Sequence, residues 1–257
     1  MRAGRPASSA TVPRQQAEPD DGRRLVTEHL STAPGRLPEW VLPLARLPGH
    51  VHRDQLSRFT PAPAAVPRCS AVLALFGEGE GGPDVLLTER AATLRSHAGQ
   101  VSFPGGAVDP GDPDAVAAAL REAREETGLD PSGVVVLGAL PEVYVPASGF
   151  GVTPVLAWWR EPSPVAVVDP AEVALVARVP VHDLVDPRNR FRVVGPGGSV
   201  GPGFRAGGLF VWGFTAGLLS RLFELSGWDR PWDRARVEPV PPRAAGQPPD
   251  QPEAPSC

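Results

Sequence analysis

The chain has 257 residues, of which 42 % are hydrophobic, and a formal net charge of −4. That length is enough for one domain with a packed core and short for two, and the negative charge argues against a protein that grips nucleic-acid backbones. No run approaches the ~20 apolar residues of a membrane-spanning helix, and the first residues lack the apolar core of a secretory signal. We therefore expect a cytoplasmic protein whose partners are neither nucleic acid nor membrane.

Both ends of the chain are polar and rich in proline, of which the whole chain has 33. Residues 1–22 and 229–257 cannot bury enough apolar surface to offset chain entropy, so we predict disordered tails. Residues 23–66 are expected to form an extension that packs on the main domain, with a helix at 23–30 and four apolar anchors: Leu37, Trp40, Val41 and Leu44. The main domain is assigned to residues 67–228.

From residue 68 onward, short apolar runs alternate with turns. The segments 71–76 and 84–88 flank a glycine-rich turn and predict a β-hairpin with a long loop. Further strands are expected at 100–103, 134–137, 143–145 and 152–159, and helices at 115–127 and 215–226. Helices among short strands of this kind indicate an α+β fold, in the form of a mixed α/β/α sandwich.

The predicted helix at 115–127 has clear start and stop signals. Asp112 is a good N-cap residue and Pro113 suits the first helical position. Gly128 is a favourable residue for the C-terminal stop. A helix of about three to four turns is therefore predicted.

Three glutamates, Glu122, Glu125 and Glu126, fall on one face of this helix. Like charges at this spacing repel by a few tenths of a kcal/mol per pair, so the cluster favours a bound cation. Mg²⁺ or Mn²⁺ is the natural choice, because hard cations prefer carboxylate oxygen. Arg121 lies four residues before Glu125 and is expected to pair with it.

The alternative interpretation of these residues is a solvated amphipathic helix with an acidic end. Two features weaken it. The preceding Gly105 and Gly106 allow a backbone turn to approach a ligand or metal closely. The acids also lie in the second half of the helix, where the helix dipole disfavours negative charge.

The stretch from Gly106 to Leu129 resembles the Nudix box, G-x5-E-x7-R-E-U-x-E-E-x-G-U, in which U is an apolar residue. Arg121 and Glu122 match R-E, and the REAREETGL run covers the remainder of the box. Two departures are visible: Asp112 stands in the place of the early Glu, and eight residues rather than seven separate it from Arg121.

The segment before the box is similar to that of the coenzyme A pyrophosphatase subgroup, which has a pattern close to L-x-x-R-x-x-x-L-R-x-H-x-G-x-V-x-F-P-G-G. The matching residues here are Arg90, Leu94, Arg95, His97, Gly99, Val101, Phe103 and Pro104. The similarity extends over roughly residues 68–225 and covers neither tail.

The resemblance implies a metal-dependent diphosphatase that acts on coenzyme A or an acyl-CoA. Glu122, Glu125, Glu126 and the carbonyl of Gly106 would hold Mg²⁺ or Mn²⁺. Catalytic roles would fall to Glu122, Glu125 and Arg121, and the identity of the general base stays open, with Glu122 a candidate. Substrate phosphates would meet Arg90, Arg95 and His97. Glu172 is a weaker candidate for a further metal ligand or base.

Two other functions remain open from the sequence. One is a hydrolase of ADP-ribose or another nucleoside diphosphate derivative. The other is a Nudix-fold module that binds a nucleotide without cleaving it, although such modules usually lose some of the acids that this chain retains. A homodimer also remains open, as does a disulfide between Cys69 and Cys257, for which two reduced thiols are the expectation.

Overall fold

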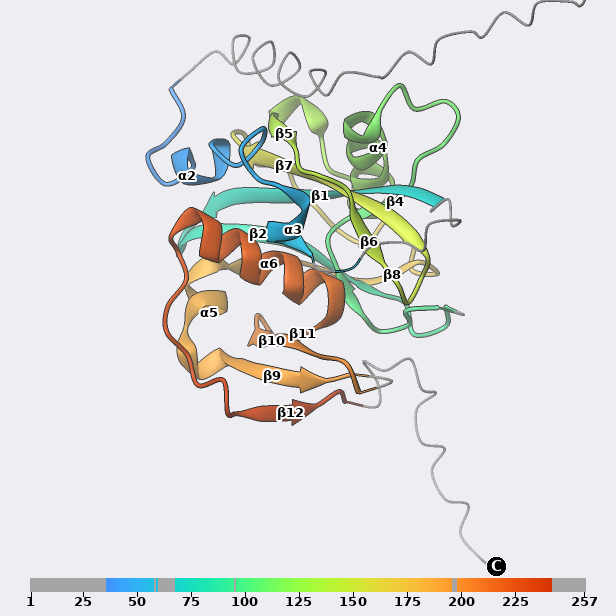
Figure 1. Cartoon of the computed structure of the whole chain (residues 1–257). Helices are drawn as coiled ribbons and strands as arrows, with labels where there is room; N and C mark the ends of the chain where they lie inside the picture. Colours follow the sequence, from blue (N-terminus) through green and yellow to red (C-terminus); the bar gives the residue numbers. More distant parts are fainter. Residues whose placement is uncertain (1–35, 58, 60–67, 95, 196–197, 242–257) are drawn as a thin grey trace, which may run out of the picture.

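The computed structural model describes residues 36–57, 59, 68–94, 96–195 and 198–241 (Figure 1). The helix expected at 23–30 lies outside these residues. No helix in the described part of the chain is long and apolar enough to cross a membrane.

Within the described residues, the main sheet contains eight strands. They are β1 (Arg68–Gly79), β2 (Gly82–Arg90), β3 (Val101–Ser102), β4 (Gly105–Ala107), β5 (Val134–Ala139), β6 (Val143–Val145), β7 (Phe150–Trp159) and β8 (Val173–Pro180). The main path runs β3-β2-β1-β7-β5, while β4 pairs with β1, β6 with β7 and β8 with β2. The β1–β7 pair is parallel and the other pairs are antiparallel, so the sheet is mixed.

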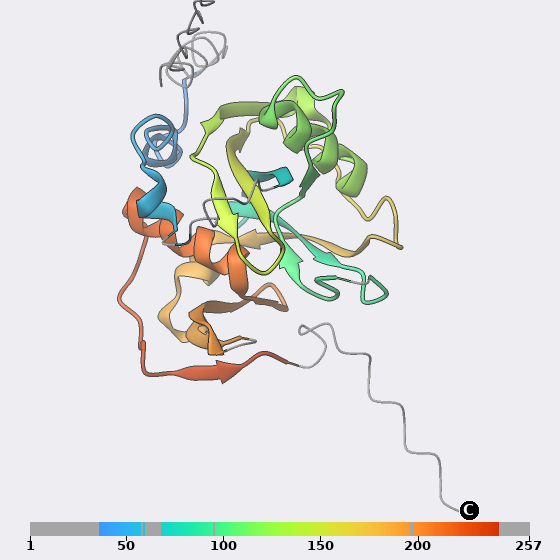
Figure 2. The same cartoon turned by 45° about the vertical axis from the view of Figure 1, so that its right-hand side comes forward.

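Helices cover both faces of this sheet, as Figures 1 and 2 show: α4 (Ala115–Thr127) lies on one face and α6 (Gly213–Ser226) on the other. The alternation of side chains along β1 explains the two cores. Leu73 and Leu75 belong to the core under α4, whereas Ala74 and Phe76 belong to the core under α6. This is the mixed α/β/α sandwich of an α+β fold, as predicted.

The short helices α2 (Leu42–Ala45) and α3 (Arg53–Leu56) lie in the segment before the main sheet. Their buried side chains, Leu44 and Leu56, are part of the core under α6. So is Val41, which directly precedes α2. The segment therefore contributes side chains to the main core and has no separate core of its own among the described residues.

The predicted hairpin, the strands and both helices are present, with strand limits that differ by a few residues. The sequence did not predict a second sheet, which has the order β11-β10-β9-β12. Its strands are β9 (Arg190–Val194), β10 (Val200–Ala206), β11 (Leu209–Val211) and β12 (Val237–Pro239), and α5 (Val181–Val185) leads into it from β8. β12 lies in the segment 229–241, which was expected to be disordered. This expectation was wrong, because β12 pairs with β9.

A buried arginine explains why this segment is ordered. Arg190 is fully buried, and its guanidinium pairs with Asp229 and donates to the Ser220 hydroxyl at 2.9 Å. The same guanidinium lies over the rings of Phe204 and Trp232, at 5.0 and 4.8 Å from their centroids. A buried cation requires a partner, so it holds the chain after α6 against the second sheet.

We expect Asp229→Ala to lower the free energy of unfolding by about 3 kcal/mol, because the change leaves the Arg190 charge buried without its carboxylate. Urea denaturation of the purified variant measures this loss. Asp233→Ala, at an exposed aspartate of the same segment, is the matched control and should cost less than about 1 kcal/mol. Equal effects of the two changes would contradict the anchoring role of Arg190.

Candidate active site

Helix α4 has the predicted limits but a different N-cap. The side chain of Asp114 accepts a hydrogen bond from the Ala117 amide at 2.8 Å, and so caps the helix that begins at Ala115. Asp112, the predicted cap, instead lies before the helix and bonds to Arg121. At the other end Gly128 adopts a left-handed conformation with φ 71°, as the predicted stop requires.

The packing of α4 brings it close to the backbone of β4. Ala118, Ala119 and Ala123 are the buried apolar side chains of the helix, and their small size lets the helix lie close to the sheet. A Cβ atom on Gly106 would lie 2.5 Å from the Glu122 carboxyl carbon, so any larger residue would displace that carboxylate. Gly105 has φ +158°, and a Cβ there would collide with the backbone of β1. Gly105 is therefore required by the pairing of β4 with β1, and Gly106 leaves the space that the Glu122 carboxylate occupies.

Arg121 joins the residues around this junction. It forms a bidentate pair with Asp112, with Nε–Oδ1 and Nη2–Oδ2 distances of 3.0 and 2.9 Å. Its Nη1 donates to both Glu122 and Glu125 at 3.0 Å, and its Nη2 donates to the Ala107 carbonyl at 3.1 Å. The predicted pair with Glu125 is confirmed. Arg121 thus holds two of the three glutamates and the strand β4 in one arrangement.

Glu126 is 6 % exposed and accepts a hydrogen bond from the Gly105 amide at 3.1 Å. Burial raises the pKa of this carboxyl to about 7, and the nearby charges of Glu122 and Glu172 act in the same direction. The Gly105 amide and the Arg90 charge lower it only in part. Burial also raises the pKa of Glu122, with Arg121 opposing the shift and Glu125 adding to it.

The three glutamates do not converge on one point. Glu122 and Glu126 lie beside Gly105 and Gly106, whereas the Glu125 side chain is 59 % exposed and reaches Arg121. No group of three His, Cys, Asp or Glu side chains in the described residues is arranged as a metal site. The three carboxylates therefore do not gather as predicted. Glu122 and Glu126 lie at β4, whereas Glu125 is exposed and pairs with Arg121, which also binds Glu122.

The donor set nevertheless fits a hard divalent cation. Glu122 and Glu126 are carboxylates in a poorly solvated position, and burial raises the pKa of each despite the opposing effects of Arg121 on Glu122 and of Arg90 on Glu126. A bound cation would stabilise the ionised form of these buried carboxylates, and carboxylate oxygen is the ligand that Mg²⁺ and Mn²⁺ prefer.

The structure brings two further residues to this pair. Arg90 ends β2 at a bulge in its pairing with β8, and it is the basic residue whose charge acts on Glu126. The loop after β7 is tied to the end of α4, since the Ala166 and Val168 amides donate to the carbonyls of Thr127 and Glu126. That loop ends at Glu172, whose charge also acts on Glu126 and whose carbonyl accepts from the amide after Arg90.

Of the other two residues predicted to bind substrate, only His97 is among the described residues. His97 lies in the loop between β2 and β3 with φ 57°, and its Nδ1 is 3.0 Å from the Gln100 side-chain oxygen. Arg95 falls outside the described residues. The loop closes on Arg90, because the Arg90 amide donates to the Gln100 carbonyl and the Gly99 amide donates to the Arg90 carbonyl.

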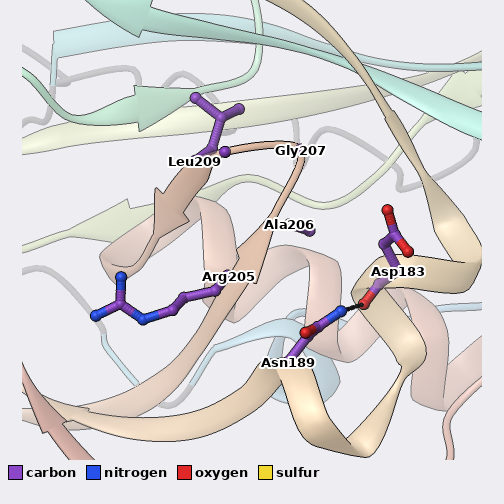
Figure 3. Close-up of a pocket in the computed structure, with 7 residues that line it drawn as sticks. Asp183, Asn189, Arg205, Ala206, Gly207 and Leu209 are labelled. Carbon is purple, nitrogen blue, oxygen red and sulfur yellow. Dashed lines mark hydrogen bonds between the residues drawn. The ribbon is translucent and has the colours of Figure 1, made fainter.

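A cavity of about 280 Å³ lies elsewhere, between α5 and the β10–β11 hairpin (Figure 3). Its polar groups are already engaged. The Asn189 amide donates to the Asp183 carbonyl at 3.0 Å, and Arg205 pairs with Glu238 at 2.9 Å. This cavity includes none of the residues around Glu126.

A family model described as NUDIX domain matches residues 67–195. The chain is 43 % identical over 147 residues to an uncharacterized Nudix hydrolase NudL of Cronobacter sakazakii, over 54 % of this chain and 73 % of that protein. It is 58 % identical over 74 residues to the NudL of Escherichia coli K12, over 29 % and 38 % of the two chains. A solved Nudix hydrolase of M. smegmatis, RenU, aligns with TM-score 0.46 and 22 % identity, over 65 % of this chain and 91 % of that one.

The raised pKa of Glu126 predicts a pH-dependent stability. Because the folded-state pKa of about 7 exceeds the ordinary 4.5, the proton stabilises the folded protein fully below pH 4.5, and this contribution is lost as the pH rises through 7. Glu126→Gln cannot ionise, so in the presence of a chelator it should be more stable than the wild type at pH 8, by up to about 3 kcal/mol. At pH 4.5 the two proteins should differ little.

Urea unfolding at both pH values measures this difference. The exposed Glu161→Gln is the control and should change stability by less than about 0.5 kcal/mol at either pH. A Glu126→Gln variant that is no more stable than the wild type at pH 8 would show that the carboxylate is adequately compensated in the folded protein.

Proposed function

This chain belongs to the Nudix family and is a Nudix diphosphatase, and we propose that it cleaves the diphosphate bond of coenzyme A or an acyl-CoA. The products would be adenosine 3′,5′-bisphosphate and 4′-phosphopantetheine or its acyl form, with one water consumed. The observation that carries this proposal is the segment 90–106. Its matches to the coenzyme A pyrophosphatase pattern end on the two glycines against which Glu122 and Glu126 lie.

The arrangement of this segment supports a phosphate-binding role. Arg90 closes the 91–100 loop through two backbone hydrogen bonds. Its positive charge also lowers the pKa of Glu126. Its Nε is buried and has no hydrogen-bond partner among the described residues. A buried donor without a partner is unfavourable in the free protein and would be satisfied by a phosphate oxygen.

Members of this family generally use divalent metal ions, and we propose Mg²⁺ or Mn²⁺ here. The ligands would be Glu122, Glu126 and the carbonyl of Gly106, and Glu125, the third predicted ligand, would join them by leaving its contact with Arg121. When bound, such ions neutralise charge on the diphosphate oxygens and make a water more acidic.

The chain's own residues would then divide the remaining work. Arg121 fixes the Glu122 carboxylate through its Nη1, so that it is held in place as the substrate enters. A glutamate oxygen accepts the proton of the attacking water, and Glu122, which faces Gly106, is our candidate for that base. Arg90 stabilises negative charge on the phosphates.

The decisive experiment incubates the purified protein with coenzyme A and Mg²⁺ or Mn²⁺ and identifies the products by mass spectrometry. We expect adenosine 3′,5′-bisphosphate and 4′-phosphopantetheine. Glu122→Gln and Glu125→Gln should each lower kcat by at least about a hundredfold, the usual contribution of a base or of its positioning. Glu161→Gln, at a surface glutamate after β7, is the control and should retain wild-type turnover.

Three outcomes would overturn parts of this proposal. Faster hydrolysis of ADP-ribose or another nucleoside diphosphate derivative than of coenzyme A would replace the substrate. Binding of these compounds without turnover would indicate a nucleotide-binding module. Turnover that survives both glutamate substitutions would refute the assignment of the site.

A further inference from the structure

Two hydroxyl groups on neighbouring strands form a hydrogen-bonded pair beside the candidate active site. Thr88 and Ser102 are direct partners across β2 and β3, and their side-chain oxygens are 3.0 Å apart. Neither residue belongs to the set that the sequence predicted for metal or substrate binding. Their place in the sheet shows what this pair can contact.

Both side chains lie on the face of the sheet that α4 covers. On β2, Leu86 belongs to the core under α4, so Thr88 and Arg90 lie on that same side. On β3, Val101 belongs to the core under α6, so the next residue, Ser102, points to the α4 side. The two hydroxyls therefore share the face on which the glutamates of α4 lie.

Arg90 is the next side chain after Thr88 on this face of β2. Its amide donates to the Gln100 carbonyl at 2.9 Å, so β2 and β3 remain paired between the two hydroxyls and Arg90. Residues in this diagonal relation are roughly 7–8 Å apart, which is within reach of a long side chain. The Arg90 guanidinium and the Ser102 hydroxyl can therefore meet the same ligand.

The acidic side of the site follows directly along the chain from Ser102. Gly105 comes three residues later, at most roughly 10 Å of extended chain away, and its amide donates to the Glu126 carboxylate at 3.1 Å. The charge of Arg90 acts on the same carboxylate. Ser102 is thus next to two groups of the candidate site, one through the strand pairing and one through the chain.

The hydrogen-bond geometry leaves the Ser102 proton available. Thr88 is 1 % exposed, and its hydroxyl has two acceptors within reach, the Ser102 hydroxyl oxygen at 3.0 Å and the Ser102 carbonyl at 3.4 Å. The shorter contact is the better one, because hydrogen bonds from hydroxyls to oxygen are usually about 2.5–3.0 Å long. Thr88 therefore donates to the Ser102 hydroxyl, whose own hydrogen then has no acceptor among the described residues. Ser102 is half-buried, so a ligand can reach it.

Two donors without acceptors thus lie on one face of the sheet: the Ser102 hydroxyl and the buried Nε of Arg90. A cationic donor beside a neutral one suits the oxygens of a phosphate. We propose that Ser102, oriented by Thr88, donates a hydrogen bond to a non-bridging oxygen of the substrate diphosphate next to Arg90. The assignment rests on the proposed function in that the substrate is a diphosphate, and it holds for coenzyme A and for ADP-ribose alike.

The test measures the affinity of the purified protein for inorganic diphosphate by calorimetric titration in the presence of Mg²⁺. We expect Ser102→Ala to weaken binding by about tenfold or more, because a hydrogen bond to a charged group is lost. Thr88→Val keeps the shape of the side chain and removes the hydroxyl, so it should weaken binding by a smaller factor. Thr88→Ser keeps the hydroxyl and should bind like the wild type. The kcat/KM for the better substrate of coenzyme A and ADP-ribose should fall in the same order.

A double-mutant cycle separates orientation of Ser102 from a general structural effect. Because Thr88 reaches the ligand only through Ser102, Thr88→Val should weaken binding by less than about twofold when residue 102 is already alanine. Ser132→Ala, at an exposed serine of the turn before β5, is the matched control and should keep the wild-type affinity. Thermal unfolding of each variant shows whether a loss of binding comes from loss of the fold.

The outcomes distinguish this assignment from the proposed function. Wild-type affinity and turnover in Ser102→Ala would show that the hydroxyl does not meet the diphosphate, and the proposed function would stand. Additive effects of the two substitutions would overturn the positioning role of Thr88. If the wild type binds inorganic diphosphate but hydrolyses neither coenzyme A nor ADP-ribose, the proposed function is wrong, and the affinities of the variants still test Ser102. A wild type that does not bind diphosphate would contradict the assignment itself.

Discussion

The contact between helix α4 and strand β4 is the constraint on which the site depends. Gly106 leaves room for the Glu122 carboxylate in this contact, and Gly105 allows β4 to pair closely with β1 on the other side, where a Cβ would strike the backbone. The contact brings one glutamate to the Gly105 amide and another over Gly106, so the acids of the helix meet a backbone rather than solvent. Without this approach the acidic end of α4 would be an ordinary surface helix face.

This arrangement brings several carboxylates close together, and they are only partly neutralised. Arg121 neutralises several acids at once, since it pairs with Asp112, Glu122 and Glu125. Glu126 is left buried, and the partial compensation by Arg90 does not keep its pKa in the usual range of a carboxyl. A site that lacks positive charge in the free protein is suited to take up cations, and such perturbed groups concentrate at functional sites. Stability at neutral pH is thus reduced at the point where the chemistry is proposed to occur.

The sequence predicted the layered fold and the limits of α4 because those features depend on local signals. Alternating apolar runs predicted the β1–β2 hairpin, and a glycine stop at Gly128 fixed the end of the helix. The N-cap was misassigned because Asp112 and Asp114 are equally good caps locally. The preference is decided by Arg121, which binds Asp112 from nine residues away.

The second sheet and the ordered segment 229–241 could not be predicted, because both depend on contacts between residues far apart in the sequence. Strand β10 contains Gly201, Pro202 and Gly203, which reads as a loop, and it becomes a strand only through its pairing with β9 and its packing under α6. The order of the last segment depends on Arg190 and Asp229, which are 39 residues apart in the sequence. The three glutamates were correctly placed on one helix, but their partners, and hence the exposed position of Glu125, required the tertiary structure.

The central claim is that the carboxylates at the α4–β4 contact take up a divalent cation. Calorimetric titration of the metal-free protein with Mn²⁺ at pH 6, in two buffers of different ionisation enthalpy, tests it most directly. At this pH Glu126, with a pKa of about 7, is mostly protonated, so cation binding at this site must expel its proton. The account predicts binding with proton release in the wild type and the loss of that release in Glu126→Gln. Binding without proton release, or no binding of Mn²⁺, would contradict it.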